Sequence, residues 1–283
     1  MPRVLIAGCG YVGRAAADLF HHAGWEVEGW TATAGSTAEL AQTPYTVRTR
    51  DVSQASDVTA ADHDFHVVVQ CVSSRGGGEE DYRRVYLRGA GNLLRAFPDA
   101  RLIFTSSTGV YPQCDGGWVT EESAAEPTRP TARVLRETEQ LVLAAGGVVM
   151  RAAGIYGPGR SFLLQRFLAG EPFFDPASDR FINQVHRDDL AAALFFVAGG
   201  EQRRGEIFNV ADGSPISARE CYEWLARHFG QLHPSTTKVK TTGRRGETNK
   251  RVSNAKLRAL GWEPRYPTFE AGMTESVIPS WAT

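Results

Sequence analysis

Three glycines near the start of the chain have the spacing of a phosphate-binding loop. Gly8, Gly10 and Gly13 form G-x-G-x-x-G directly after the short apolar run Val4–Ala7. In this pattern the first glycine permits a tight turn, the second lets the backbone approach a pyrophosphate, and the third allows close helix–strand packing. The start of the following helix would offer free N–H groups and a positive dipole end to the phosphates. The motif predicts a dinucleotide site, with a glycine turn that binds nothing as the alternative.

The residues after the second expected strand bear on which dinucleotide is bound. In an NAD site this strand ends in an acidic residue that binds the ribose 2′-hydroxyl. Here Trp30 is followed by Thr31-Ala32-Thr33-Ala34-Gly35-Ser36-Thr37, without Asp or Glu, and Glu28 lies too early. Small hydroxyl side chains leave room for a 2′-phosphate and can donate hydrogen bonds to it. We therefore expect NADP, with NAD as the alternative. Asp51 and Val52, after the third strand, are expected to border the adenine, although a solvated turn would also explain Asp51.

These residues need a framework of strands and helices to position them. Apolar runs predict strands at residues 4–7, 25–30, 65–70, 102–105, 147–151 and 207–210, with a weaker one opened by Val47. Helical composition lies between them at residues 14–22, 81–97, 132–145 and 188–197. Strands alternating with helices are typical of a parallel sheet covered on both faces. The sequence predicts an α/β fold: a Rossmann-type doubly wound parallel sheet with a smaller, discontinuous C-terminal subdomain.

The composition of the chain changes after Arg151. Residues 154–176 are rich in Gly, Pro and Phe, and from Gly213 onward short helices and turns follow without another strong strand. This pattern indicates that two insertions build the smaller subdomain. We assign residues 1–157 and 181–212 to the dinucleotide-binding domain, and residues 158–180 and 213–283 to a substrate-binding subdomain.

Composition excludes several classes of protein. The 283 residues are 42% hydrophobic and 22% charged with a net charge of -1, which is ordinary for a globular domain and gives no reason to expect nucleic acid or anionic membrane as a partner. The four cysteines are widely spaced, so we expect free thiols and no metal site. No signal peptide and no membrane-length apolar stretch is visible, which favours the cytoplasm. Lysine occurs only at positions 238, 240, 250 and 256, so no mechanism can use a lysine from the first 237 residues.

Further segments carry a resemblance to a known family. They are Ile6–Gly13, Gly89–Leu94, the S-S-x-x-V-Y segment at Ser106–Tyr111, the R-x-x-x-I-Y-G-P-G segment at Arg151–Gly159, Val185–Ala191 and Leu260–Trp262. Together they resemble the extended short-chain dehydrogenases/reductases of the NAD(P)-dependent epimerase/dehydratase group. The resemblance implies that the glycine loop binds the cofactor and that the Y-G-P-G loop lies close to the nicotinamide. It also implies that the smaller C-terminal part closes over the substrate, often a nucleotide-sugar.

The resemblance and the motifs together give a set of expected site residues. Cofactor contacts are expected at Gly8, Gly10, Tyr11, Val12, Gly13, Thr31, Thr33, Asp51, Val52, Gln70, Cys71, Val72, Ser106, Ala153, Gly154 and Ile155. Substrate contacts are expected at Tyr156, Arg160 and Arg251. Lys250 could also bind a substrate diphosphate, and a plain surface charge is the alternative for each of these basic residues. Ser107 aligns with a serine that helps to polarise the substrate, and capping of the next turn is its alternative.

The acid–base pair that the family uses is missing. In the family a tyrosine on the helix after the S-S strand is the general acid/base, and a lysine four residues later lowers its pKa. A Glu usually follows that tyrosine by eight positions. If this Glu is Glu139, Thr131 takes the tyrosine position and Leu135 the lysine position. A threonine hydroxyl is far too weak an acid for proton exchange near pH 7 without strong activation.

The other alignment does not restore the pair either. If the family Glu is Glu137, the two positions fall on Arg129 and Arg133, and no Tyr anywhere in the chain has a Lys four residues on. The remaining candidate acids are Tyr111, which the family places near the substrate, and His186. A family-typical asparagine before Gly89 is also replaced, by Tyr86.

Two functions follow from these observations. The first is an NAD(P)-binding oxidoreductase or epimerase-type enzyme that acts on a polar small molecule, such as a nucleotide-sugar, with a non-standard catalytic set that includes Ser107 and Tyr111. The second is a catalytically inactive NADP-binding sensor that acts through a protein partner. The glycine loop, Ser107 and the Y-G-P-G loop favour the enzyme, whereas Thr131 and Leu135 favour the sensor. The expected partner is a small-molecule substrate, and a homodimer stays open.

Overall fold

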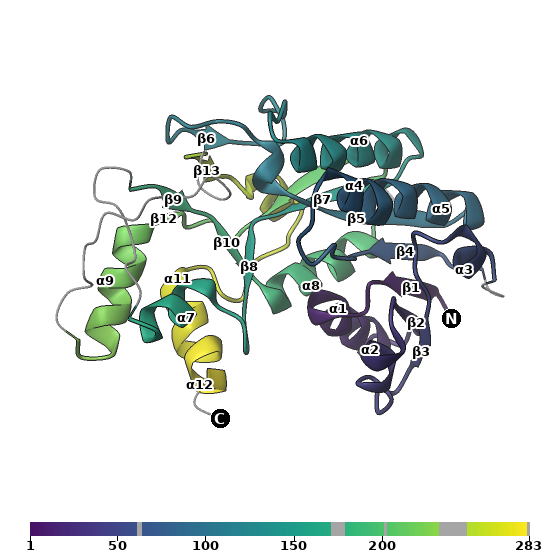
Figure 1. The fold of residues 1–283 in the computed structure, drawn as a ribbon, viewed down its shortest axis with the longest axis horizontal. Coiled ribbons are helices and arrows are strands. Elements are labelled where there is room, and N and C mark those ends of the chain that lie inside the picture. Colours follow the sequence, from purple (N-terminus) through teal and green to yellow (C-terminus); the bar gives the residue numbers. More distant parts are fainter. Residues whose placement is uncertain (61–63, 171–178, 201–202, 232–247, 282–283) are drawn as a thin grey trace. The chain divides into compact units, whose positions relative to one another are not determined.

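The computed structural model describes residues 1–60, 64–170, 179–200, 203–231 and 248–281 of the chain (Figure 1). Part of the expected loop at residues 154–176, as well as Lys238 and Lys240, lies outside the described residues. The chain forms two compact units. The first comprises Met1–Val110, Ala125–Ala152 and Leu190–Phe208, and the second comprises Tyr111–Ala124, Ala153–Asp189 and Asn209–Thr283. This division groups residues 111–124, 153–157, 181–189 and 209–212 with the second unit, and the domain boundaries expected from the sequence stay a prediction.

A seven-stranded sheet organises the first unit. Its strands are β1 (Arg3–Ala7), β2 (Glu26–Thr31), β3 (Thr46–Thr49), β4 (Val67–Gln70), β5 (Arg101–Ser107), β7 (Val148–Ala152) and β11 (Ile207–Val210). They are ordered β11-β7-β5-β4-β1-β2-β3. Within this order, each pair of neighbouring strands between β7 and β3 is parallel. The chain runs outward from β1 to β3 and then returns to β4, so the strand order reverses between β1 and β4. In open α/β sheets this reversal marks the crevice where ligands bind.

Helices cover both faces of this sheet. They are α1 (Tyr11–His22), α2 (Ala34–Ala38), α3 (Ala55–Thr59), α4 (Glu79–Tyr82), the π-helical turn η1 (Arg83–Arg88), α5 (Gly89–Ala96), the short 3₁₀ turn η2 (Thr108–Val110), α6 (Pro130–Ala144) and α8 (Arg187–Ala198). Figure 1 shows α4, α5 and α6 along one face of the strands and α1 along the other. On that other face, Phe20 of α1 packs edge-on against Phe195 of α8, with ring centroids 5.0 Å apart.

Continuous apolar strands explain why the sheet lies at the centre. Val4–Ala7 of β1 and the four residues of β4 are buried, without the alternation of a half-exposed strand. A parallel strand covered on both faces needs apolar side chains in both directions. The predicted fold class, a Rossmann-type doubly wound parallel sheet, is confirmed by this topology.

Short strands and helices build the second unit. Its two-stranded pairs join β8 (Gly154–Tyr156) to β10 (Gln184–His186), β9 (Phe181–Ile182) to β12 (Ile216–Ser217), and β6 (Trp118–Val119) to β13 (Arg251–Val252). Its helical segments are α7 (Phe162–Leu168), α9 (Ala218–His228), α10 (Ala255–Ala259), α11 (Phe269–Gly272), the π-helical turn η5 (Met273–Val277) and α12 (Ile278–Trp281). Their apolar faces meet in a core that includes Tyr156, Leu164, Tyr222, Leu225 and Phe269. No helix among the described residues is long and apolar enough to cross a membrane.

One turn of wider helix interrupts the run from α4 to α5. In η1 the backbone adopts the π-helical pattern, which frees carbonyl groups from their usual partners. Gln70, the last residue of β4, donates its side-chain N–H to the carbonyls of Tyr86 at 3.2 Å and Val85 at 3.4 Å. The sheet therefore stabilises this turn directly.

Arginines close the ends of helices in the first unit. Arg50 donates to the carbonyls of Asp57 at 2.5 Å and Ala60 at 2.8 Å, where α3 ends. Arg101 donates to the carbonyls of Ala198 and Gly200, where α8 ends. These carbonyls have no partner within their helices, and positive charge is favourable there.

Candidate functional site

The glycine loop has the geometry of a phosphate cradle. A Cβ at Gly8, where φ is +97°, would lie 2.6 Å from the backbone nitrogen of Val72, and a Cβ at Gly13 would lie 2.2 Å from the carbonyl oxygen of Gly8. A Cβ at Gly10, by contrast, would meet no atom within 4 Å. The loop is thus packed shut on the side of the sheet and open at Gly10, where α1 begins. The N–H groups of the first helical turn have no acceptor within a helix, so Tyr11, Val12 and Gly13 present them to this opening. These residues fit a dinucleotide pyrophosphate.

The segment after β4 forms the second wall of this loop. Cys71 directs its thiol to the carbonyl oxygen of Gly8 at 3.4 Å, and Val72 touches the same glycine. Burial raises the pKa of the Cys9 thiol to about 12, and it raises the pKa of Cys71 further. Both thiols therefore stay protonated at neutral pH, and their role here is packing.

A chain of hydroxyl groups occupies the end of β2. The hydroxyl oxygens of Thr31 and Thr37 lie 2.7 Å apart, and those of Thr37 and Thr49 lie 2.8 Å apart. Thr33 caps α2, because its side chain accepts a hydrogen bond from the backbone N–H of Ser36. Glu28 accepts a hydrogen bond from the Trp30 indole at 2.7 Å and pairs with Arg48 at 3.2 Å. Its carboxylate is thus already engaged below the end of the strand.

Asp51 and Val52 join β3 to the neighbouring helices. The carboxylate of Asp51 accepts a hydrogen bond from the Ser53 N–H at 2.9 Å, as in a capped turn. Val52 is buried, and its carbonyl accepts a hydrogen bond from the Asn92 side chain at 2.8 Å. The contact of these two residues with adenine stays a prediction.

A buried ionic network lies beneath the end of β5. Ser106 donates its hydroxyl proton to Glu139 of α6 at 2.6 Å, and Arg151 of β7 donates to the same carboxylate at 2.8 and 3.0 Å. The side chains of Arg151 and Glu139 are 1% and 0% exposed. Arg136 also donates to Glu139. The side chain of Ser106 is therefore used within the unit, which leaves its backbone as the part expected to face a cofactor.

Ser107 sits at the open end of the same strand. Its hydroxyl oxygen accepts a hydrogen bond from the Gly109 N–H at 3.1 Å, so it caps the turn η2. As an acceptor in this contact, the hydroxyl keeps its own proton for donation. Capping and a contact with substrate are thus compatible.

The orientation of α6 favours one of the two alignments of the missing pair. Leu135 and Glu139 lie one turn apart and are both buried, with the half-buried Thr131 one turn before them. Arg133 is exposed and donates to the carbonyl of Pro127 at 3.2 Å. This position favours the alignment that sets Thr131 and Leu135 in place of Tyr and Lys.

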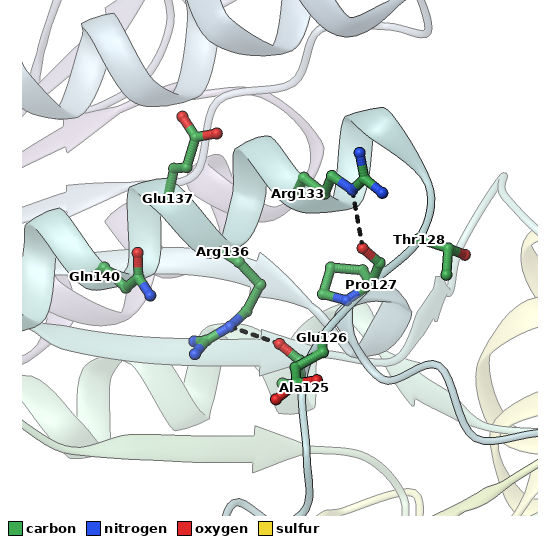
Figure 2. Close-up of a pocket in the computed structure, with 8 residues that line it drawn as sticks. All are labelled: Ala125, Glu126, Pro127, Thr128, Arg133, Arg136, Glu137 and Gln140. Carbon is green, nitrogen blue, oxygen red and sulfur yellow. Dashed lines mark hydrogen bonds between the residues drawn. The ribbon is translucent and has the colours of Figure 1, made fainter.

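A cavity of about 610 Å³ lies on the outer side of α6 (Figure 2). It is lined by residues 125–128 and by Arg133, Arg136, Glu137 and Gln140 of the helix. Arg133 and Arg136 each donate to a backbone carbonyl of the facing segment, and Glu137 is paired with Arg83 at 2.6 Å. None of the expected cofactor or substrate residues lines this cavity.

The Y-G-P-G loop belongs to the second unit. Ala153 donates its N–H to the carbonyl of Val210, and Gly154 and Ile155 pair with β10. Tyr156 is 3% exposed in the core of that unit, perpendicular to the His186 ring at 5.3 Å. A Cβ at Gly272 would lie 2.0 Å from the Tyr156 hydroxyl oxygen, so only glycine fits there. The expected substrate contact of Tyr156 would have to come from this packed position.

Tyr111 is fully buried and firmly held. Its hydroxyl donates to the side-chain oxygen of Asn209 at 2.9 Å. Its carbonyl accepts a hydrogen bond from the Lys250 ammonium at 3.1 Å. Lys250 is 5% exposed, and burial lowers the pKa of its ammonium to about 8. Lys250 is therefore not a surface charge.

The two remaining expected substrate residues lie in different settings. Arg160 is exposed in a turn closed by paired backbone hydrogen bonds with Gly157. Arg251 donates to the carbonyl of Gly116 at 2.9 Å and lies over the rings of Trp118 and Phe181.

His186 is neutral and structural. Its Nδ1 accepts a hydrogen bond from the Asp188 N–H at 3.2 Å, so Nε2 carries the proton and donates to Ser276 at 2.9 Å. Burial lowers its pKa to about 4. Asp189 accepts hydrogen bonds from the N–H groups of Arg265 and Tyr266 at 2.7 and 3.0 Å.

Comparison with known proteins places the chain among its relatives. It is 28% identical over 278 residues to protein YeeZ of Escherichia coli K12, covering 94% of this chain and 97% of that one. A solved structure from Methylobacillus flagellatus, assigned to the NAD-dependent epimerases/dehydratases, is 28% identical and superimposes with a TM-score of 0.82 over 100% of this chain and 99% of the other. The dTDP-glucose 4,6-dehydratase of Bacillus anthracis, solved with NAD, shares the fold with a TM-score of 0.84 at 18% identity, over 100% and 97% of the two chains. The model of the NAD dependent epimerase/dehydratase family matches residues 4–211. The chain belongs to the NAD-dependent epimerase/dehydratase family.

Proposed function

We propose that the protein binds NADP(H) and is an oxidoreductase or epimerase-type enzyme that acts on a polar small molecule of the nucleotide-sugar class. The observation that carries this proposal is the glycine loop, which is packed shut against Val72 and open at Gly10. The nucleotide-sugar class is supported by the dTDP-glucose dehydratase that shares the fold. A bound nicotinamide dinucleotide would supply hydride transfer.

The chain's own residues would hold the two ends of this ligand. The N–H groups of Tyr11, Val12 and Gly13 would bind the pyrophosphate, and Thr31 and Thr33 would face the adenosine ribose. Ser107 would donate its hydroxyl proton toward a substrate oxygen, while its oxygen stays on the Gly109 N–H. Ala153, Gly154 and Ile155 are the residues expected to border the nicotinamide.

The preference for NADP can be tested at Thr33. This residue is exposed and caps α2, and Asp caps helices as well as Thr does. Thr33→Asp therefore adds a charge without removing the cap. If a 2′-phosphate binds here, calorimetry should show NADP binding weakened at least about tenfold relative to NAD. Thr33→Ser, which keeps hydroxyl and cap, is the matched control. Equal weakening of NAD and NADP by Thr33→Asp would argue against a 2′-phosphate site.

Catalysis is tested separately from binding. A wild-type protein that binds neither NADP nor NAD at millimolar concentration would refute the proposed function. If binding is seen, hydride exchange is measured with carbonyl compounds and nucleotide-sugars. Tight binding with no exchange across both classes would favour the sensor, which Thr131 and Leu135 support. The homodimer stays a prediction.

A further inference from the structure

Tyr86 lies in the π-helical turn η1, and its hydroxyl faces the segment that follows β4. The phenol oxygen accepts a hydrogen bond from the backbone N–H of Ser74 at 3.4 Å. This backbone donor and the side chains of Ser73 and Ser74 lower the pKa of the Tyr86 phenol, whereas burial, the largest effect, raises it. A donor to the phenol oxygen favours its phenolate form. Single π-helical turns within a helix occur frequently at functional sites.

The same segment touches the glycine loop one residue earlier. Val72, directly before Ser73, lies against Gly8, and the Cys71 thiol lies on the Gly8 carbonyl. Residues 71–74 therefore connect the expected phosphate cradle to the Tyr86 hydroxyl. Both lie at the carboxyl ends of β1 and β4, the edge where open α/β sheets bind their ligands.

Packing holds the Tyr86 ring in this position. Its centroid lies 4.9 Å from that of Tyr82 and 6.2 Å from that of Phe104 on β5. Burial raises the pKa of Tyr86, and its neighbour Tyr82 adds to this effect. The charged groups on the adjoining elements form ion pairs with one another. Arg83 pairs with Glu137 of α6 and with Glu79, Arg84 with Asp81 and Asp51, and Arg88 with Glu80.

The other tyrosines with described hydroxyl contacts are less suited to proton transfer. Tyr45 donates to Asp18 of α1 at 2.8 Å, and Tyr111 donates to Asn209 from a fully buried position. Tyr156 is enclosed in the core of the second unit.

We propose that Tyr86 takes over the proton-transfer role that the missing tyrosine has in the family. In the oxidative direction the Tyr86 phenolate oxygen accepts the proton of a substrate hydroxyl, the carbon-bound hydrogen leaves with its electron pair to the oxidised nicotinamide, and a carbonyl forms. In the reverse direction the Tyr86 phenol returns the proton to the carbonyl oxygen as hydride arrives at carbon. This proposal rests on the proposed function.

The test uses the charge of the nicotinamide, because a nearby cationic ring favours the Tyr86 phenolate. In mildly alkaline buffers of different ionisation enthalpy, calorimetry should show that wild-type protein releases a fraction of a proton on binding oxidised cofactor and none on binding reduced cofactor. Its affinity for oxidised cofactor should rise with pH, by up to about tenfold per pH unit. Tyr86→Phe should abolish both effects while it keeps cofactor binding within about threefold, because the ring remains. Once a substrate is known, Tyr86→Phe should slow hydride exchange by at least about 100-fold relative to wild-type protein.

Tyr82→Phe is the matched control, since it removes a neighbouring phenol from the same helical run. It should keep the proton release, with an onset at slightly lower pH because Tyr82 no longer raises the pKa of Tyr86. A tyrosinate difference spectrum of the wild-type protein, recorded on addition of oxidised cofactor, should show directly that a tyrosine ionises when the cofactor binds. Proton release that persists in Tyr86→Phe, or that is absent from wild-type protein that binds cofactor, would overturn the role of Tyr86 and leave the proposed function standing. Failure of the wild type to bind either dinucleotide would overturn both.

Discussion

Removal of the Glu139 carboxylate should destabilise the first unit strongly. Glu139 accepts two hydrogen bonds from Arg151 and one from Ser106, and its side chain is 0% exposed. In Glu139→Ala the Arg151 guanidinium stays charged and buried but loses this carboxylate. Breaking a buried ion pair from one side costs about 3–5 kcal/mol. For a chain of this size, each kcal/mol shifts the unfolding midpoint by roughly 2–4 °C. The midpoint of Glu139→Ala should therefore fall by about 6–20 °C in a calorimetric scan.

Glu137→Ala on the same helix is the matched control. Glu137 pairs with Arg83 at 2.6 Å, but the two side chains are 42% and 36% exposed, so water can solvate Arg83 once its partner is removed. Surface pairs contribute about 0–1 kcal/mol, which predicts a shift below about 4 °C. Replacement of the buried pair by apolar residues, Glu139→Leu with Arg151→Met, should recover much of the loss, because both fully buried charges are removed together. Equal destabilisation by Glu139→Ala and Glu137→Ala would refute this reasoning.

Three further predictions concern single groups. Burial lowers the pKa of His186 from 6.5 to about 4, so the unfolded chain takes up a proton at higher pH than the folded chain does. The free energy of unfolding should therefore fall as pH drops from about 6.5 to 4. His186→Asn should flatten this part of a plot of urea midpoint against pH. Burial raises the pKa of Asp212 from 3.8 to about 7, so the folded chain holds a proton that the unfolded chain releases. Stability should then fall as pH rises from about 4 to 7, and Asp212→Asn should remove this loss. If the pH profile of Asp212→Asn matches that of the wild type, Asp212 is ionised in the folded state. Gly10→Ala should keep the wild-type melting temperature but weaken dinucleotide binding more than about tenfold, because its Cβ meets only open space, whereas Gly13→Ala should lower both.

The parts of the fold with a local signal were predictable from sequence. The strand at Val4–Ala7, the glycines and the helix after them lie within about twenty residues, and each follows from side-chain types that the printed sequence shows. The two- and three-residue strands of the second unit have no such signal. β13 at Arg251 pairs with β6 at Trp118, a partner far away in sequence that only the folded chain selects.

The candidate site was predictable in the same uneven way. Motifs identified Tyr156 but could not show that its ring points into the core of the second unit rather than outward. The spacing on α6 left Glu139 and Glu137 as alternatives, and it gave no sign of Arg151 on β7, which binds Glu139. Tyr86 was visible as a replaced asparagine, but the turn that aims its hydroxyl depends on Gln70, sixteen residues earlier. In each case the missing information was the direction of a side chain.

The carboxyl ends of α3 and α8 are held by arginine rather than lysine, and this has a chemical consequence. Arg50 and Arg101 each reach two carbonyls with one forked side chain, which a single lysine ammonium would bridge less rigidly. A guanidinium also keeps its charge at pH values where a lysine becomes neutral. Reagents that modify amines therefore have no lysine to attack at these helix ends.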